Sequence, residues 1–91
     1  MFQPEKYRRN PDVSWRLIEG QAVLVHNREG EIEVLNEVGS YLWEHAGEPL
    51  EGLARNISRD FDVSEGAALR DAEAFYEELA ASGVLQPKDE A

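Results

Sequence analysis

Hydrophobic and polar residues alternate in the first half of the chain, whereas apolar residues recur every three or four positions in the second half. The change falls at Leu35-Asn36, inside the stretch GEIEVLNEVGSYLWEH at residues 30–45. Alternation is typical of half-buried strands and the longer spacing is typical of amphipathic helices. The pattern therefore predicts an α+β fold: a three-stranded antiparallel sheet followed by three helices, in a winged helix-turn-helix-like arrangement.

Three segments have strand character, namely residues 13–18, 21–26 and 31–35. Glu19-Gly20 and the polar NREG at 27–30 separate them, which predicts an antiparallel meander joined by tight turns. The middle segment, QAVLVH, is almost continuously apolar, so we expect it to be covered on both faces. Alternation in the third strand should place Ile32 and Val34 on one face, and Glu31, Glu33 and Leu35 on the other.

Three helices follow, and polar or glycine residues mark their ends. Asn36 and Ser64 are suited to cap the first and third helices, and Pro49 lies near the start of the second. Gly39 lies inside the first helix at a cost of about 1 kcal/mol relative to alanine, so another group should approach the backbone there. Gly83 should end the third helix in a Schellman motif.

Proline content and composition divide the chain into three parts. We expect a flexible N-terminal arm at residues 1–12, one folded domain at residues 13–86 and a disordered tail at residues 87–91. At 91 residues with 42% hydrophobic content, the chain can bury one core but has little room for an enclosed enzyme pocket. Function is therefore expected on the surface.

The formal net charge is −10, from 19 acidic and 9 basic residues. Such a surface repels phosphate, so we expect no nucleic-acid partner, and a cationic partner is easier to accommodate. The last helix would be the DNA-reading helix of a winged helix, yet it offers Arg70 against five carboxylates. Without a secretory signal or an apolar run of about 18 residues, we expect a cytoplasmic protein without membrane contact.

Candidate catalytic and metal-binding groups are scarce in the sequence. There is no cysteine, and His26 and His45 lie on different predicted elements without metal-ligand spacing. The serines and glycines form neither a nucleophile motif nor a phosphate-binding loop. We therefore expect no enzyme activity, no metal site and no cofactor.

The strand EIEVL at 31–35 is the most informative surface feature, because the last strand of a meander has one unpaired edge. Three uses remain open from the residues alone. Glu31 and Glu33 could simply discourage aggregation, an extended peptide could pair with the edge, or a second copy could pair with it in a homodimer. An acidic winged-helix interaction adaptor or transcription factor is the alternative from another class.

The order of several short motifs resembles the PqqD-like proteins, also called RiPP precursor-peptide recognition elements. The match begins with Gly30, Leu35-Asn36, Gly39 and Leu42-Trp43, and continues after a helix with Asp71-Ala72, Phe75-Tyr76, Leu79 and Gly83-Val84-Leu85. It runs from about Trp15 to Leu85. The resemblance implies a non-catalytic peptide chaperone that binds the leader of a ribosomally synthesised precursor peptide and presents it to a modifying enzyme, often a radical SAM protein.

The resemblance also implies a peptide-binding site. The leader would lie as an additional strand along the third strand, and the third helix would border the cleft. By position, the implied site residues are Glu31, Ile32, Glu33, Val34, Leu35, Arg70, Asp71, Ala74, Phe75 and Glu78. Phe75 is also expected to face the core.

The biosynthetic pathway stays open at this point. HNREG at 26–30 stands where members of the pyrroloquinoline quinone (PQQ) pathway tend to have a proline-bearing hairpin. A PQQ pathway, a lasso-type pathway and another radical SAM pathway are therefore all compatible with the sequence.

Overall fold

The computed structural model describes residues 1–88 of the chain. In chain order, its elements are η1 (Pro4–Lys6), β1 (Tyr7–Arg9), β2 (Val13–Ile18), β3 (Gln21–His26), β4 (Glu31–Val34), α1 (Glu37–Glu44), α2 (Leu50–Phe61), α3 (Glu65–Ala81) and β5 (Leu85–Pro87). The three strands and three helices expected from the sequence are present, and the α+β fold class is confirmed.

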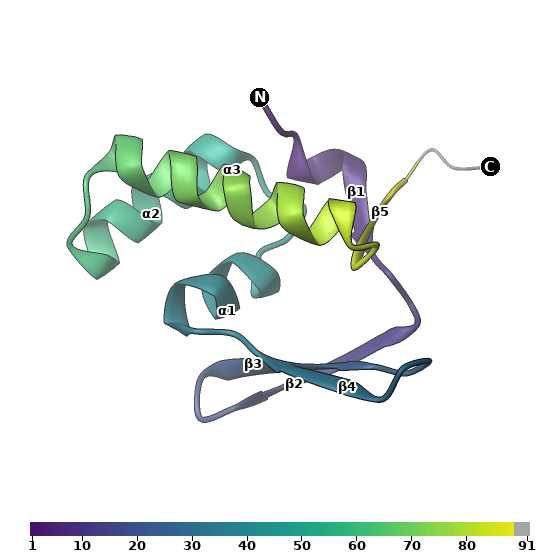
Figure 1. The fold of residues 1–91 in the computed structure, drawn as a ribbon. Coiled ribbons are helices and arrows are strands. Elements are labelled where there is room, and N and C mark those ends of the chain that lie inside the picture. The colour runs from purple at the N-terminus through teal and green to yellow at the C-terminus, as the bar shows by residue number, and fades with distance from the viewer. Residues whose placement is uncertain (89–91) are drawn as a thin grey trace.

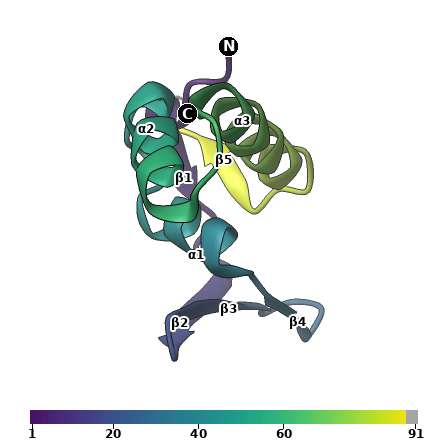
Figure 2. The same cartoon turned by 90° about the vertical axis from the view of Figure 1, so that its left-hand side faces the viewer.

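The main sheet is an antiparallel meander with the order β2-β3-β4. Val13 pairs with His26 at one end of β2, and His26 pairs in turn with Glu31 of β4. The helices lie on one side of this sheet, with α1 between the sheet and the other two helices (Figures 1 and 2). The opposite face of the sheet is not covered by any element of residues 1–88.

This one-sided arrangement corrects the expectation for β3. Ala22 and Leu24 are buried against the helices, whereas Val23 and Val25 are only partly covered. The near-continuous apolar run suggested burial on both faces, but its second face meets no layer of secondary structure. On that face, Val23 and Val25 instead lie beside the exposed side chains of Val34 and Ile32 and form an apolar surface with them.

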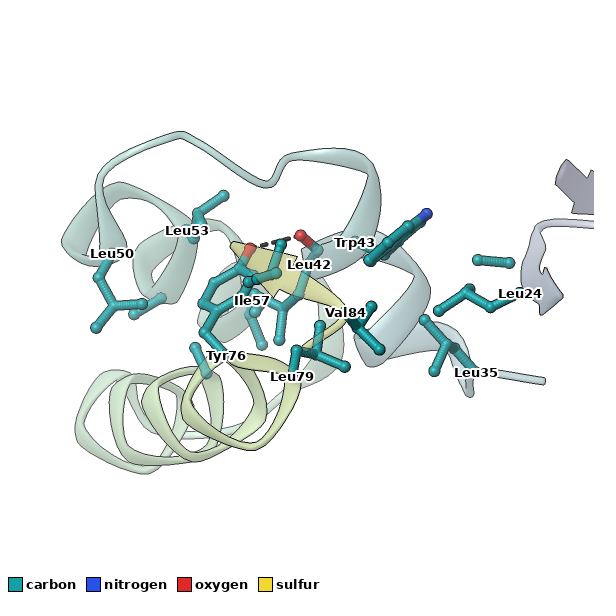
Figure 3. Close-up of a cluster of buried hydrophobic side chains, with 14 of the residues drawn as sticks. Leu24, Leu35, Leu42, Trp43, Leu50, Leu53, Ile57, Tyr76, Leu79 and Val84 are labelled. Atoms are coloured by element: carbon teal, nitrogen blue, oxygen red, sulfur yellow. Dashed lines mark hydrogen bonds between the residues drawn. The ribbon is translucent and has the colours of Figure 1, made fainter. Parts of the chain in front are cut away.

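The core lies between the helices and extends to the inner face of the sheet (Figure 3). Its buried hydrophobic residues are Val13, Ala22, Leu24, Leu35, Leu42, Trp43, Leu50, Leu53, Ala54, Ile57, Ala68, Ala72, Tyr76, Leu79, Val84 and Leu85. Tyr76 is fully buried and its hydroxyl donates a hydrogen bond to the Leu42 carbonyl, drawn as a dashed line in Figure 3. This bond joins α3 to α1 and satisfies a polar group inside the core.

The predicted helix caps are confirmed. The Asn36 side chain accepts a hydrogen bond from the Gly39 N–H at 2.7 Å, and Ser64 Oγ accepts one from the Ala67 N–H at 3.1 Å. At the end of α3, Gly83 has a φ of +83°, and the Val84 N–H donates to the Leu79 carbonyl at 2.9 Å. That six-to-one bond is the one that defines the Schellman motif.

Residues 1–12, which we expected to be a flexible arm, are packed against the rest of the fold. Strand β1 pairs antiparallel with β5 in a second, two-stranded sheet, with Arg8 opposite Gln86. Pro4 is buried, and the Phe2 ring stacks on Tyr7 at 4.6 Å between centroids. Aromatic burial and strand pairing thus hold a segment whose prolines suggested a loose terminus.

The expected disordered tail at residues 87–91 is only partly within the described residues. Pro87 is the last residue of β5, and the Lys88 N–H donates to the Lys6 carbonyl at 2.9 Å. Residues 89–91 lie outside the described residues. The two ends of the fold therefore meet through backbone hydrogen bonds.

Arg9 fastens β1 to α1. Its guanidinium donates to the backbone carbonyls of Trp43 and Glu44, and its Cζ lies 4.8 Å from the ring centroid of Trp15 and 5.1 Å from that of Trp43. Desolvation lowers the pKa of Arg9 from its ordinary value. The carbonyls at the end of a helix are electronegative, so a cation in this position stabilises α1.

Within residues 1–88, no helix combines the length and the apolar character needed to cross a membrane.

Candidate functional site

The edge of β4 is unpaired within residues 1–88, because the sheet order ends with this strand. The Leu35 N–H donates to the Ala22 carbonyl at 2.9 Å, which fixes this pair as hydrogen-bonded. Hydrogen-bonded pairs alternate along an antiparallel ladder, so the backbone groups of Glu33 and Glu31 also face β3. Those of Ile32 and Val34 consequently face outward, where an additional strand would find them.

A groove of about 350 Å³ lies between β4 and α3. It is lined by His26, Glu29, Glu31, Glu33, Phe75, Glu78, Leu79 and Ser82. Glu31 and Glu33 point to this side because alternation turns Ile32 and Val34 to the opposite face of the sheet. The unpaired edge of β4 and the side chains of α3 therefore border one channel, which we call the β4–α3 groove.

The groove continues toward the start of α1. A second hollow of about 320 Å³ is lined by Asn36, Val38, Gly39, Leu42, Asp71 and Phe75. Phe75 lines both hollows, so its ring stands at their junction. A Cβ at Gly39 would lie 3.3 Å from Phe75 Cε1, which is the close approach expected for a glycine inside a helix.

Carboxylates dominate the polar lining of the β4–α3 groove. Glu29, Glu31, Glu33 and Glu78 contribute to it, and the single basic side chain among its lining residues is His26. His26 Nε2 lies 3.5 Å from Glu33 Oε1. The four carboxylates give the groove a negative potential. No group of three or more His, Cys, Asp or Glu side chains in the described residues has an arrangement that could hold a metal ion.

Ser40 holds the end of β4 in place. Its Oγ accepts a hydrogen bond from the Ala22 N–H at 2.7 Å and donates one to the Leu35 carbonyl at 3.2 Å. The hydroxyl thereby replaces a direct Ala22-to-Leu35 bond at the point where the chain leaves the sheet to enter α1. Because Ser40 is buried, this bridge fixes the position of the strand relative to the helices.

The structure brings some of the residues in the sequence-derived site together. Glu31, Glu33, Phe75 and Glu78 line the groove, and Asp71 lies in its extension beside α1. Phe75, which we also expected to face the core, is half-buried and lines the β4–α3 groove.

The other members of that set lie elsewhere. Ile32 and Val34 are on the outer face of the sheet with exposed fractions of 68% and 59%, so they border the edge through their backbone rather than the groove. Leu35 is a core residue with an exposed fraction of 6%. Arg70 and Ala74 are exposed on α3 but do not line either hollow.

Four groove residues were missed by the sequence argument: His26, Glu29, Leu79 and Ser82. Two signals could have found them. Phe75, Leu79 and Ser82 follow one another at helical spacing, so a groove that contains the first should contain the others. The meander register places His26 opposite Glu31, so a groove that contains Glu31 should also contain His26.

The fold and the groove define a class of protein: a small α+β domain with a three-stranded meander whose last strand has an open edge beside a helix. Residues 21–85 match the family model described as "Coenzyme PQQ synthesis protein D (PqqD)". Since this match spans most of the chain, the protein belongs to the PqqD family, and the resemblance inferred from its sequence motifs is confirmed.

Two solved structures are similar to this chain. "Lasso peptide synthetase B1 complexed with the leader peptide" has a TM-score of 0.80 and 24% identity, covering 90% of this chain and 99% of that chain. "TbiB1 in Complex with the TbiA(beta) Leader Peptide" has a TM-score of 0.75 and 26% identity, covering 92% of this chain and 98% of that chain. The comparison with curated proteins gave no match.

Proposed function

We propose that this protein binds the leader segment of a ribosomally synthesised precursor peptide by adding it as a strand to β4, and presents the precursor to a modifying enzyme. The observation that carries the proposal is the unpaired edge of β4 beside a groove. Main-chain hydrogen bonds supply affinity in this mode of recognition, and pockets for alternate side chains supply specificity.

The backbone of β4 is prepared for such pairing. Ile32 and Val34 direct their N–H and C=O groups away from β3, while Ser40 holds the strand end at a fixed position. A preformed edge lowers the cost of ordering on binding, because only the peptide has to be fixed. Membership of the PqqD family and likeness to two domains solved in complex with leader peptides support a leader peptide as the ligand.

The role we propose is non-catalytic. The protein holds the leader, and the chemistry takes place in a separate modifying enzyme, for which a radical SAM protein is one candidate. The pathway is either PQQ biosynthesis or another route to a modified peptide. A cytoplasmic location would suit this role, because ribosomally synthesised peptides are made in the cytoplasm.

The direct test is an amide NMR titration with the leader of the precursor encoded near this protein. We expect the largest shifts at residues 31–35 and at Phe75 and Glu78 of α3. Shifts confined to another face, with residues 31–35 unmoved, would show that the peptide does not bind to this edge. Sedimentation at several protein concentrations tests whether self-association instead uses the same edge.

A proline variant tests strand pairing itself. Ile32→Pro removes an outward N–H without removing a β3–β4 ladder bond, because proline is tolerated where the N–H faces away from the sheet. Loss of one backbone hydrogen bond should weaken leader binding about fivefold. Ile32→Ala is the matched control, since it shortens the same exposed side chain but keeps the N–H.

Equal affinities of Ile32→Pro and Ile32→Ala would contradict strand addition at this position. The amide spectrum of each variant without peptide checks that the sheet is intact. Should Ile32→Pro disturb the sheet, Val34→Pro removes the neighbouring outward N–H and serves as the second test.

A further inference from the structure

The two faces of β4 differ sharply in chemistry. On the groove side, Glu31 and Glu33 stand with Glu29 and Glu78 around the same hollow. On the outer side, Ile32 and Val34 are largely exposed, and the register places them opposite Val25 and Val23 of β3. The strand thus presents carboxylates to one side and aliphatic side chains to the other.

The outer face is unusual for a chain with a formal net charge of −10. Alternation and the β2–β3–β4 register assign Ser14, Arg16, Ile18, Gln21, Val23, Val25, Ile32 and Val34 to this face. None of these residues is acidic, although 19 of the 91 residues in the chain are. The negative charge of β4 is therefore confined to the groove side of the strand.

A strand added to β4 would meet both faces at once. Successive side chains of an extended peptide point to opposite sides, so every second one would enter the β4–α3 groove and the intervening ones would lie beside Ile32 and Val34. Side chains of neighbouring strands on the same face lie close enough to interact, and like charges placed opposite one another are destabilising.

Charge and apolar complementarity then set what the peptide can be. Lys or Arg is favoured in the groove, where several glutamates converge, and Asp or Glu is rejected there. Aliphatic or β-branched residues are favoured on the outer side, where they cover the exposed surfaces of Ile32 and Val34. The strand edge defines the site, and the glutamates set its charge preference.

We propose that the segment held by β4 has a two-residue repeat, with cationic side chains facing the groove and aliphatic side chains facing outward. This inference rests on the proposed function and adds the class of peptide that is recognised. It excludes an acidic leader segment from the edge, and it distinguishes a patterned peptide from one that is merely basic.

The test is a selection from a displayed library of random peptides of about nine residues, long enough to pair with Glu31–Val34 and extend beyond it. We expect enriched peptides to carry Lys or Arg at every second position with Val, Ile or Leu between them. The best peptide should shift the amide signals of residues 31–35. A peptide of the same composition with its cations in one block should bind more weakly.

Paired variants separate the groove from the general acidity of the protein. Glu31→Gln with Glu78→Gln should weaken the selected peptide about fivefold, because exposed ion pairs contribute modestly. Glu51→Gln with Glu77→Gln makes the same change in charge at exposed positions outside the β4–α3 groove, and should leave affinity unchanged. Equal weakening by both pairs would overturn the proposal, because it would indicate attraction to the net charge alone.

The remaining outcomes are also distinguishable. Enriched peptides without cations, or with cations lacking the two-residue repeat, would overturn this inference. If the natural leader nevertheless shifts residues 31–35, the proposed function stands and only the peptide class is wrong. If the leader shifts other residues and not these, the proposed function fails, and this inference fails with it.

Discussion

Ser40→Ala offers a sharp test of how the β4 edge is held in place. The substitution removes the acceptor for the buried Ala22 N–H and one donor to the Leu35 carbonyl. Leu35 keeps a second donor, because Gln21 Nε2 lies 3.3 Å from its carbonyl oxygen. The main loss is therefore the unsatisfied N–H of Ala22, which has an exposed fraction of 0%.

The expected cost follows from that single orphaned donor. A buried polar group without a partner destabilises the folded state by about 1–3 kcal/mol, and we take about 2 kcal/mol for Ser40→Ala. Urea unfolding measures it. With a denaturant slope of about 1 kcal/mol per M, the unfolding midpoint should fall by about 2 M while the slope stays unchanged.

Ser58→Ala is the matched control. Ser58 Oγ also donates to a backbone carbonyl, that of Val63 at 2.6 Å, but this bond is at the surface and water can replace it. We expect less than about 0.5 kcal/mol for this change. If the two alanine variants unfold at the same urea concentration, the serine bridge does not hold β4 as argued.

Three further predictions concern the core and its attachments. Arg9→Met should destabilise the fold by about 2 kcal/mol, because the charged hydrogen bonds to the Trp43 and Glu44 carbonyls are lost. Arg9→Lys should not restore the stability in thermal unfolding, since lysine lacks the planar guanidinium. Full rescue by lysine would contradict the role of the guanidinium over the Trp15 and Trp43 rings. Gly39→Ala should lower the urea midpoint despite better helix propensity. The new Cβ would lie 3.1 Å from Asn36 Oδ1, the oxygen that caps α1, and 3.3 Å from Phe75 Cε1, and a rise in the midpoint would refute this. Burial raises the pKa of the Tyr76 hydroxyl, so stability should be constant below the unfolded-state pKa of about 10 and fall above it by up to about 1.4 kcal/mol per pH unit. A Tyr76→Phe variant whose alkaline stability profile is as steep as that of the wild type would exclude this residue as the cause.

Local signals in the sequence predicted the helices and the meander well. Asn36 and Ser64 cap their helices through hydrogen bonds to residues three positions away, so the information lies within a few residues. The turn at Glu19-Gly20 likewise fixes the β2–β3 register over a short distance, with Ile18 opposite Gln21. Such features depend little on the rest of the fold.

Contacts between distant segments were not predictable in the same way. Strands β1 and β5 have three residues each and come from opposite ends of the chain, so neither shows a periodic pattern that identifies its partner. The same applies to Arg9, whose place between Trp15 and Trp43 depends on how β1 and β2 meet α1. The prolines of the N-terminal segment pointed to disorder because their tertiary partners could not be read from the sequence.

The candidate site combines both kinds of information. The alternation of residues 31–35 and the register of the meander give the two faces of β4, but they do not say which face a helix covers. The placement of α3 decides that Glu31 and Glu33 border the groove. The ladder pattern turns the main-chain groups of Ile32 and Val34 outward, and alternation places their side chains on the outer face, so neither side chain lines the groove.

The β1–β5 pairing has a consequence for protein engineering. It brings the start and the end of the fold side by side on the helical side of the molecule, away from the β2–β3–β4 sheet (Figures 1 and 2). A second polypeptide could therefore be fused at either end without obstructing the β4 edge. A short linker could also join the two ends, so that new termini are opened in the exposed Glu19-Gly20 turn, which does not line the groove, and the same domain is made as a circular permutant.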